Sequence, residues 1–266
     1  MLISLNIRLR EYPLRRITDY TAPLDATWKI PGICYQTWVD NKFGKSHASE
    51  IRKFRNLNPD ISWLLFDEKK LNDYMLKFWG QHPIYQVFIK SKFGPMRADI
   101  FRYCILFDRG GYYFDISKGC ESPIRMMHDK NCEALISFEN NSHGNTLEVK
   151  TSALLDFPHN LIIQWGFGFA KGHIFLEEVI GSIVDRYKDY EGTIFQNPKE
   201  AILELTGPRA FTAAVQSKIN TSDLQFVTQA GIDFHGRGVY ALRGSFVRYF
   251  TKEHYTESSN SSLFYD

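Results

Sequence analysis

The chain has 266 residues, of which 44% are hydrophobic and 23% charged, and these are the proportions of an ordinary globular protein. Its net charge is only +2, with lysine and arginine spread along the sequence, which argues against an electrostatic nucleic-acid-binding protein. No apolar run approaches the roughly 20 residues that a helix needs to span a bilayer.

Residues 1–30 are expected to form an arm in front of the folded domain. The apolar section at its start is too short, and its arginines too many, for a secretory signal. Two interpretations of the arm are open. Arg8, Arg10, Arg15 and Arg16 either rest on an anionic membrane surface, with the apolar residues between them dipping inward, or are solvated on an edge strand or docking arm.

The next segment alternates strands and helices at lengths that predict a parallel α/β sheet. Asp67 is expected to be the N-cap of the second helix, because its carboxylate accepts from free backbone N–H groups there. The predicted elements are a strand over 33–38, a helix over 49–57, a strand over 61–66, and a helix after Asp67 with Leu71, Tyr74, Met75 and Phe78 as its apolar residues.

A helix that begins at Gly94-Pro95 is followed almost at once by a short strand. Gly110 or Gly111 ends the helix, and the strand 112–114 then carries Asp115 at its carboxyl end. Ligands bind at the carboxyl ends of strands in open α/β sheets, and an acid buried there without a partner is costly. We therefore expect Asp115 to face a metal or a sugar in a cleft. The predicted buried face of the helix consists of Met96, Ile100, Tyr103, Cys104 and Phe107.

Asp99 and Arg102 lie three positions apart on this helix, so they share a face and can pair. One interpretation is a surface ion pair worth less than about 1 kcal/mol. The other places both in a cleft, where Arg102 neutralises a phosphate or sugar oxygen and Asp99 accepts hydrogen bonds from sugar hydroxyls. The apolar surroundings of the pair and the nearby Asp115 strand favour the second interpretation.

The second half of the chain shows no repeat and no low-complexity linker. Residues 31–255 are therefore expected to form one domain and 256–266 a frayed tail, apart from Phe264 and Tyr265. The further predicted elements are strands over 134–138 and 161–165, a helix over 175–187, a helix that begins at Thr206-Gly207-Pro208, and short strands from residue 224.

Two runs in this half have a structural and a functional interpretation each. The polar run 139–145 is typical of an acceptor-positioning loop and equally of an ordinary turn. The aromatic run 165–169 could stack on a sugar, but core packing is expected for at least two of its rings.

Three blocks of the sequence together resemble glycosyltransferase family 32, which includes capsular polysaccharide transferases and is related to the sugar-transferring domains of large clostridial toxins. The blocks are IPGICYQTW, RADIFRYCILFDRGGYYFDI and TGPRAF, which begin at residues 30, 97 and 206. The central block is the most specific, because its Asp, Arg, Gly-Gly, Tyr and Asp spacings match without a gap. The resemblance covers about residues 31–250.

The resemblance implies an α/β protein of the GT-A type, a Rossmann-like nucleotide-diphospho-sugar transferase with a mixed sheet flanked by helices. It also implies a nucleotide-sugar donor bound through Mn²⁺ or Mg²⁺, and transfer with retention at the anomeric carbon. The residues that match the motif as catalytic candidates are Asp115, Asp99 and Arg102. Those that match donor-binding positions are Gln36, Thr37 and Trp38 beside the base, Asp99 and Arg102 on sugar and phosphate, Tyr113 beside the diphosphate, and Asp115 as the first acid of the Asp-x-Asp motif. Arg97 is a further donor-binding candidate. Those on the acceptor side are Gly207, Pro208 and Arg209.

The sequence departs from the family pattern at the metal. Ser117 stands where the motif has its second acid, and Tyr35 stands where the first block usually has a histidine. Hard cations prefer carboxylate oxygens, so a neutral hydroxyl removes a charge from the site. With Asp115, Ser117 and His254 as the candidate ligands, we expect the metal dependence to be weak.

Other residues could compensate for the missing acid. A carboxylate such as Glu121 or Asp108 could substitute for it. Alternatively the metal is absent and a basic residue, with Lys118 as the first candidate, offsets the charge of the diphosphate.

The sequence thus predicts a glycosyltransferase that extends a glycan or lipid-linked glycan in surface polysaccharide synthesis, such as capsule. A second interpretation is a catalytically weakened sugar-nucleotide or glycan-binding protein with the same fold. A third interpretation is a phosphatase-type loop over 113–117 with Asp115 as nucleophile. Such a loop needs an acid two residues later for proton transfer, and this sequence has none there. The four cysteines have no Cys-x-x-Cys spacing and apolar surroundings, so we expect reduced thiols and a cytoplasmic location, which includes the inner face of the membrane.

Overall fold

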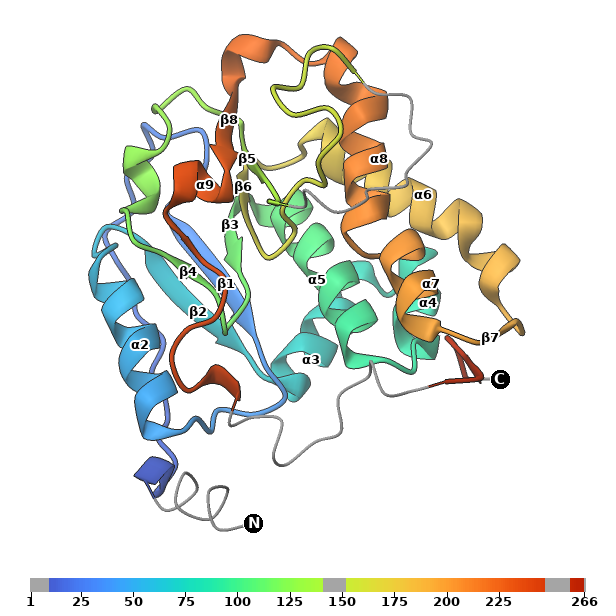
Figure 1. Cartoon of the computed structure of the whole chain (residues 1–266), viewed down its shortest axis with the longest axis horizontal. Coiled ribbons are helices and arrows are strands. Elements are labelled where there is room, and N and C mark those ends of the chain that lie inside the picture. The colour runs from blue at the N-terminus through green and yellow to red at the C-terminus, as the bar shows by residue number, and fades with distance from the viewer. Residues whose placement is uncertain (1–9, 141–151, 247–258, 266) are drawn as a thin grey trace.

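A six-stranded mixed sheet lies at the centre of the molecule (Figure 1). The structure is a computed structural model that describes residues 10–140, 152–246 and 259–265. The strands of the sheet, in spatial order, are β2 (Ser62–Phe66), β1 (Ile33–Thr37), β3 (Gly111–Phe114), β6 (Gly166–Phe169), β5 (Ala134–Phe138) and β8 (Val227–Ile232).

Five of these strands run in the same direction. β1 pairs in parallel with β2 and β3, β5 pairs in parallel with β8, and β6 runs antiparallel to both β3 and β5. The ends of β1, β2, β3, β5 and β8 therefore meet at one side of the sheet, which we call the carboxyl edge. The mixed sheet confirms the predicted fold class.

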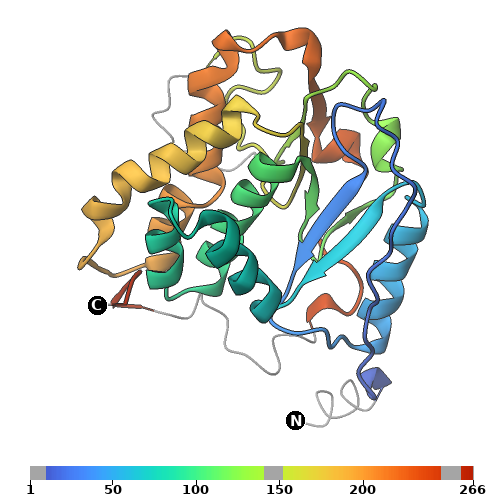
Figure 2. The same cartoon turned by 180° about the vertical axis from the view of Figure 1, so that it is seen from behind.

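Helices cover both faces of the sheet (Figures 1 and 2). On one face, α5 packs against α3, α4 and α6, and α6 packs against α7 and α8, while α2 and α9 lie on the other. The helices are α2 (Lys45–Asn56), α3 (Glu68–Trp79), α4 (Ile84–Lys90), α5 (Gly94–Arg109), α6 (Ile174–Tyr190), α7 (Pro198–Leu205), α8 (Pro208–Lys218) and the short α9 (Asp233–Gly236). The remaining short elements are β4 (Gly119–Cys120), β9 (Gly238–Val239), β7 (Ile194–Phe195), β10 (Ser261–Ser262) and three 3₁₀ turns, η1 (Ile124–Met126), η2 (Ile219–Thr221) and η3 (Leu224–Phe226).

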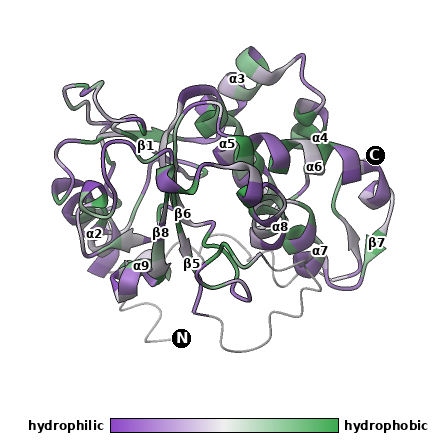
Figure 3. Ribbon diagram, turned by 90° about the horizontal axis from the view of Figure 1, so that it is seen from above, coloured by the Kyte–Doolittle hydropathy of each residue, from purple (hydrophilic) through white to green (hydrophobic). Residues whose placement is uncertain are grey.

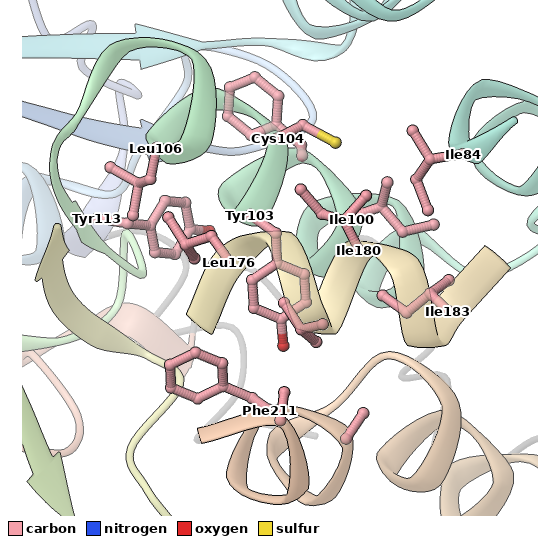
Figure 4. Close-up of a cluster of buried hydrophobic side chains, with 14 of the residues drawn as sticks. Ile84, Ile100, Tyr103, Cys104, Leu106, Tyr113, Leu176, Ile180, Ile183 and Phe211 are labelled. Carbon is pink, nitrogen blue, oxygen red and sulfur yellow. The ribbon is translucent and has the colours of Figure 1, made fainter. Parts of the chain in front are cut away.

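The larger hydrophobic core fills the space between the sheet and the helices α3 to α8. Figure 4 shows its centre, where Tyr103 of α5 and Phe211 of α8 stack with ring centroids 5.7 Å apart. Figure 3 shows hydrophobic and hydrophilic residues alternating along the helices, as expected when one face of each packs on a core. Within the described ranges, no helix is both long and apolar enough to cross a membrane.

Helix α5 is buried more completely than the sequence predicts. Every residue from Asp99 to Leu106 is buried, whereas Phe107 is only partly so. The helix ends at Gly110 with φ +67°, and Gly111 follows with φ +114°, a region that L side chains rarely adopt. The double glycine thus allows β3 to begin immediately after the helix, as predicted.

Several predicted boundaries differ from the structure for identifiable reasons. Helix α2 begins at Lys45, four residues earlier than predicted, because Glu11 of the arm accepts a hydrogen bond from the Ser46 N–H at 2.8 Å. Helices α4 and α7 are not predicted by the sequence pattern. On α3, Trp79 is buried and Phe78 is exposed, so the prediction for Phe78 is wrong.

The predicted strand over 161–165 is wrong, because these residues make only a single bridge to β5, between Ile162 and Phe138. The strand lies just after them as β6, whose sequence alternates glycine and phenylalanine. A Cβ atom on Gly168 would lie 2.5 Å from the Tyr112 ring, so only glycine allows this close approach. Phe167 and Phe169 are fully buried, which confirms core packing for two rings of the run.

Both ends of the described chain dock on the body. The arm bridges Arg15 to Phe43 and Tyr20 to Trp63, which supports the docking-arm interpretation for its described part. At the other end β10 pairs with β7, and Phe264 is buried, so the described tail is not frayed. The side chain of Tyr265 is exposed, but its backbone N–H donates to Lys90 O at 2.8 Å, so it too is held in place.

Candidate active site

Three charged side chains meet at the carboxyl edge, where α5 begins and β3 ends. Arg102 Nη2 lies 3.2 Å from Asp99 Oδ1 and 3.2 Å from Asp115 Oδ1. The side chains of Arg102 and Asp99 are 6% and 8% exposed, whereas that of Asp115 is 31% exposed. The surface ion pair is therefore the wrong interpretation, because two of the three charges are buried and the third opens to solvent.

Arg102 is held on several sides. Its Nη1 donates to the backbone oxygen of Gln164 at 2.9 Å, and its Cζ lies 4.5 Å from the centroid of the Tyr113 ring. Burial lowers the pKa of Arg102, but Tyr113, Asp115 and Asp99 together raise it above its usual value. The guanidinium is a fixed positive charge, and its Nε has no partner among the described residues.

Asp99 accepts a second hydrogen bond from a distant part of the chain. The Oγ1 of Thr206, between α7 and α8, donates to Asp99 Oδ2 at 2.9 Å. The backbone oxygen of Thr206 in turn accepts from Tyr103 Oη and Gln164 Nε2, both at 2.9 Å. Burial raises the pKa of Asp99 to about 7, although Arg102 and Thr206 oppose this rise.

Asp115 lies in a tight turn that leaves one of its oxygens available. Its Oδ1 accepts from Tyr113 Oη at 3.0 Å as well as from Arg102, and its backbone N–H donates to Trp165 O at 2.8 Å. Oδ2 accepts no hydrogen bond from the residues that the structure describes. The turn closes through Lys118, whose N–H donates to Asp115 O at 2.8 Å. Tyr113 is thus fully buried, and its hydroxyl points at the Asp115 carboxylate.

The predicted base-binding residues differ in their exposure. Gln36 is fully buried, and its Oε1 accepts from Arg55 Nη2 at 2.8 Å. Thr37 and Trp38 follow at the carboxyl edge and are partly exposed, and both bind the backbone oxygen of Phe66. An open pocket lies next to them, formed by the 39–42 loop, the start of α3 and Arg16 of the arm.

Arg97 lies on another side of α5 from Arg102. Its guanidinium contacts Asn72 and Glu68 of α3 and lies 4.7 Å from the centroid of the Phe88 ring. Arg97 thus contacts two residues that line the open pocket, Asn72 and Glu68, and the structure shows no contact between it and Asp115.

The structure shows no contact between the three predicted acceptor residues and Asp99. Gly207 is buried, Pro208 begins α8, and Arg209 pairs with Glu200 at 2.7 Å and Glu204 at 2.9 Å. In this block it is Thr206 that reaches the acidic cluster, and the sequence signal for it is the Thr-Gly-Pro block itself.

The described residues do not complete a divalent metal site. Ser117 is only 4% exposed and offers a neutral oxygen, and no group of three His, Cys, Asp or Glu side chains within the described ranges could hold a metal ion. The candidate ligand His254 lies outside the described residues. The described donor set therefore does not fit a metal on its own.

The candidate substitutes for the missing acid also lie apart from Asp115. Asp108 is nine residues beyond Asp99 on α5, about 13 Å along the axis at roughly 1.5 Å per residue. It accepts from Tyr74 Oη at 2.9 Å, so the prediction that it replaces the acid is wrong. Glu121 follows β4 and is exposed, and the structure shows no contact between it and Asp115.

A second acid stands at the carboxyl edge, directly after β5. Burial raises the pKa of Glu139 to about 7, against the opposing charge of Lys118, and Asp233 adds to the rise. The Lys118 ammonium also lies 3.1 Å from the centroid of the Tyr240 ring. Like Asp115, Glu139 is an acid immediately after a predicted strand. The same sequence pattern could therefore have identified Glu139, which is instead predicted only as part of a polar loop.

Comparisons with known proteins relate the chain to glycosyltransferases. Residues 44–134 match the family described as "Glycosyltransferase sugar-binding region containing DXD motif". The initiation-specific alpha-1,6-mannosyltransferase of Candida albicans is 29% identical over 232 residues, which cover 79% of this chain and 58% of that protein. Inositol phosphoceramide mannosyltransferase 3 of Schizosaccharomyces pombe is 25% identical over 158 residues, which cover 58% of this chain and 37% of that protein.

The chain thus spans less than two thirds of the length of these curated relatives. Among solved structures, PaToxG glycosyltransferase superposes with a TM-score of 0.51 at 15% identity, covering 85% of this chain and 79% of that one, and so shares its fold. Residues 44–134 thus resemble the sugar-binding region of glycosyltransferases with the DXD motif, the chain is similar in sequence to mannosyltransferases, and its fold is that of a solved glycosyltransferase.

Proposed function

We propose that the protein transfers a sugar from a nucleotide-diphosphate donor to a hydroxyl group of a glycan or lipid-linked glycan. The observation that carries the proposal is the Asp99–Arg102–Asp115 cluster, in which a buried guanidinium holds an acid that is open to solvent. Such a fixed charge at the carboxyl edge can stabilise negative charge that develops on a leaving diphosphate.

In the proposed reaction the bond from the anomeric carbon to the diphosphate oxygen breaks, and its electrons leave with the diphosphate. The acceptor oxygen forms the new bond on the same face of the sugar, and its proton passes to the leaving diphosphate. Arg102 stabilises the developing charge, and Asp115 Oδ2 accepts a hydrogen bond from a donor hydroxyl. Retention is tested by the anomeric configuration of the product, read by NMR.

The named relatives guide the choice of substrates. They are mannosyltransferases, and one of them is named for inositol phosphoceramide as its acceptor. We therefore propose a mannosyl donor and a lipid-anchored acceptor as the first pair to test. A role in surface polysaccharide synthesis at the inner face of the membrane remains part of this proposal.

The decisive experiment is a panel of nucleotide sugars scored for donor hydrolysis and for transfer, with the parent protein and Asp115→Asn compared. Asp115→Asn keeps the shape of the side chain but removes the charge that pairs with Arg102. We expect it to abolish transfer while the circular dichroism spectrum and melting temperature show a folded protein. Full activity in the folded variant would remove Asp115 from the mechanism.

A second candidate function, a sugar-nucleotide or glycan-binding protein of weakened activity, is favoured by Ser117. This residue replaces a charged position of the motif and is itself buried. Calorimetric titration with nucleotide sugars, with and without Mn²⁺, separates the two functions. Tight binding without hydrolysis or transfer of any donor would favour the binding protein.

A further inference from the structure

A cluster of basic side chains lies where the arm meets the start of α2. Its members are exposed, and none forms an ion pair with a carboxylate among the residues that the structure describes. We call this cluster the basic face, and it consists of Arg10, Arg15, Arg16, Lys42 and Lys45.

The backbone that carries the basic face is held firmly to the body of the protein. Arg15 and Phe43 exchange backbone hydrogen bonds of 2.7 and 2.9 Å. The Glu11 carboxylate accepts from the N–H and hydroxyl of Ser46, at 2.8 and 2.6 Å, and so joins the arm to the first turn of α2. The Asn41 side chain accepts a hydrogen bond from the Ile17 N–H at 2.8 Å and donates one to the Ile17 backbone oxygen at 2.6 Å. The five cations therefore occupy one fixed surface rather than a loose segment.

The acids beside the basic face lie on its pocket side. Glu11 is buried and occupied by Ser46, whereas Asp40 is exposed beside Lys42, and Asp67, Glu68 and Asp73 line the pocket that Arg16 and Lys42 also line. Tyr12, between Arg10 and Arg15, is 48% exposed, and an exposed tyrosine flanked by arginines suits the interface between lipid headgroups and acyl chains.

The basic face adjoins the edge of the sheet that carries the candidate active site. Lys42 belongs to the loop that follows β1, and Arg16 and Lys42 line the open pocket together with Asn72, the partner of Arg97. Figures 1 and 2 place the start of α2 on the same lower side of the molecule as the ends of β1 and β2. A surface that binds the basic face therefore lies close to the open pocket at the carboxyl edge.

We propose that the basic face docks the protein on an anionic membrane surface, with the carboxyl edge turned toward an acceptor held in that membrane. The inference rests on the proposed function for its acceptor, but not for the docking itself. Each basic residue close to an anionic leaflet strengthens binding about fivefold. A nucleic acid is the less suitable partner, because the net charge of the chain is only +2 and the exposed Tyr12 suits a lipid interface.

The test is sedimentation of the full chain with vesicles of phosphatidylcholine alone and of phosphatidylcholine mixed with phosphatidylserine. The parent is compared with the variant Arg10→Gln/Arg15→Gln/Lys45→Gln. The matched control is Lys77→Gln/Lys130→Gln/Lys171→Gln, which removes three exposed cations toward the opposite edge of the sheet. Donor hydrolysis of all three proteins without vesicles tests the proposed function separately and is expected to be equal.

We expect the parent and the control to bind the phosphatidylserine vesicles, and to bind more weakly as salt screens the charges. The basic-face variant should lose on the order of 100-fold in binding. No binding of the parent, or equal binding of the variant and the control, would overturn the proposal. A labelled oligonucleotide that binds more tightly than the vesicles, and is lost in the same variant, would overturn the choice of a membrane.

Discussion

Arg102 is the residue on which the geometry of the site depends. One guanidinium contacts both acids and also the backbone oxygen of Gln164. The spacing of Asp99 and Arg102 and the position of Asp115 after a strand predict this cluster from the sequence. The bond to Gln164 could not be predicted, because a backbone oxygen carries no signal in the residue type.

Arg102→Lys tests whether the planar fork matters or only the charge. A single ammonium cannot span Asp99, Asp115 and the Gln164 oxygen at once. We expect turnover to fall about 10- to 100-fold, the effect of losing one charge-assisted hydrogen bond. Arg97→Lys is the control, because that arginine of the same helix contacts α3, and it should cost less. Equal turnover of Arg102→Lys and the parent in a steady-state assay would contradict this role.

Ser117 allows a direct test of the metal. We expect the parent to need metal on the order of millimolar, and Ser117→Asp to tighten Mn²⁺ binding by about tenfold, because it adds a carboxylate to the site. Ser117→Asn is the control of similar size without the charge. Metal affinity is read from the Mn²⁺ dependence of donor hydrolysis after chelation. If Ser117→Asp and Ser117→Asn bind Mn²⁺ equally, the position is not a metal ligand.

Glu139 predicts a pH dependence of stability. Burial raises the pKa of Glu139 to about 7, whereas the pKa of a free glutamate is about 4.3. Between these values the folded protein keeps a proton that the unfolded chain has lost, so this group makes stability fall as the pH rises. Glu139→Gln should therefore flatten the decline in the free energy of unfolding, measured by urea denaturation, between about pH 5 and about pH 7.

Glu133→Gln, at the other end of β5, controls for the loss of a carboxylate as such. It forms an exposed ion pair with Lys29 at 3.6 Å and lies away from Lys118 and Asp233. An unchanged pH slope in Glu139→Gln would show that Glu139 is ionised in the folded protein throughout this range.

At the scale of elements, the pattern of β6 shows why a predicted strand lies a few residues from its real position. The apolar run 161–165 has the stronger strand signal, but the glycines of β6 allow that segment to approach the rings of β3. A local pattern cannot reveal a fit between two strands distant in the sequence. The same limit applies to α2, whose first turn is fixed by Glu11 of the arm.

Gly168→Ala tests this close approach. The added methyl group would lie 2.5 Å from the buried Tyr112 ring, and we expect a loss of about 1–3 kcal/mol in the free energy of unfolding. Gly181→Ala in α6 is the control, since its Cβ meets nothing within 4 Å, and it should gain about 0.5–1 kcal/mol from helix propensity. Urea denaturation of both variants gives the comparison, and equal stabilities would contradict the tight fit.

At the scale of the whole molecule, the fold class and the order of the main elements follow from the sequence pattern. The convergence of distant segments does not follow from it. Thr206 is separated from Asp99 by more than a third of the chain, yet its hydroxyl binds the acid directly. The resemblance to family 32 marked the Thr-Gly-Pro block, but the contact itself required the packing of α5 against α6 and of α6 against α8.

This convergence has a consequence for the segment that bears the family signature. Residues 44–134 hold Asp99, Arg102 and Asp115, but Gln164 and Thr206, which satisfy two of them, lie outside it. Cut out alone, the segment would leave a guanidinium and a carboxyl group without those partners, and would lack β6, which separates β3 from β5 in the sheet. The signature is therefore a landmark within a larger cooperative unit rather than an autonomous module, and the shortest fragment able to assemble the cluster must extend at least as far as α8.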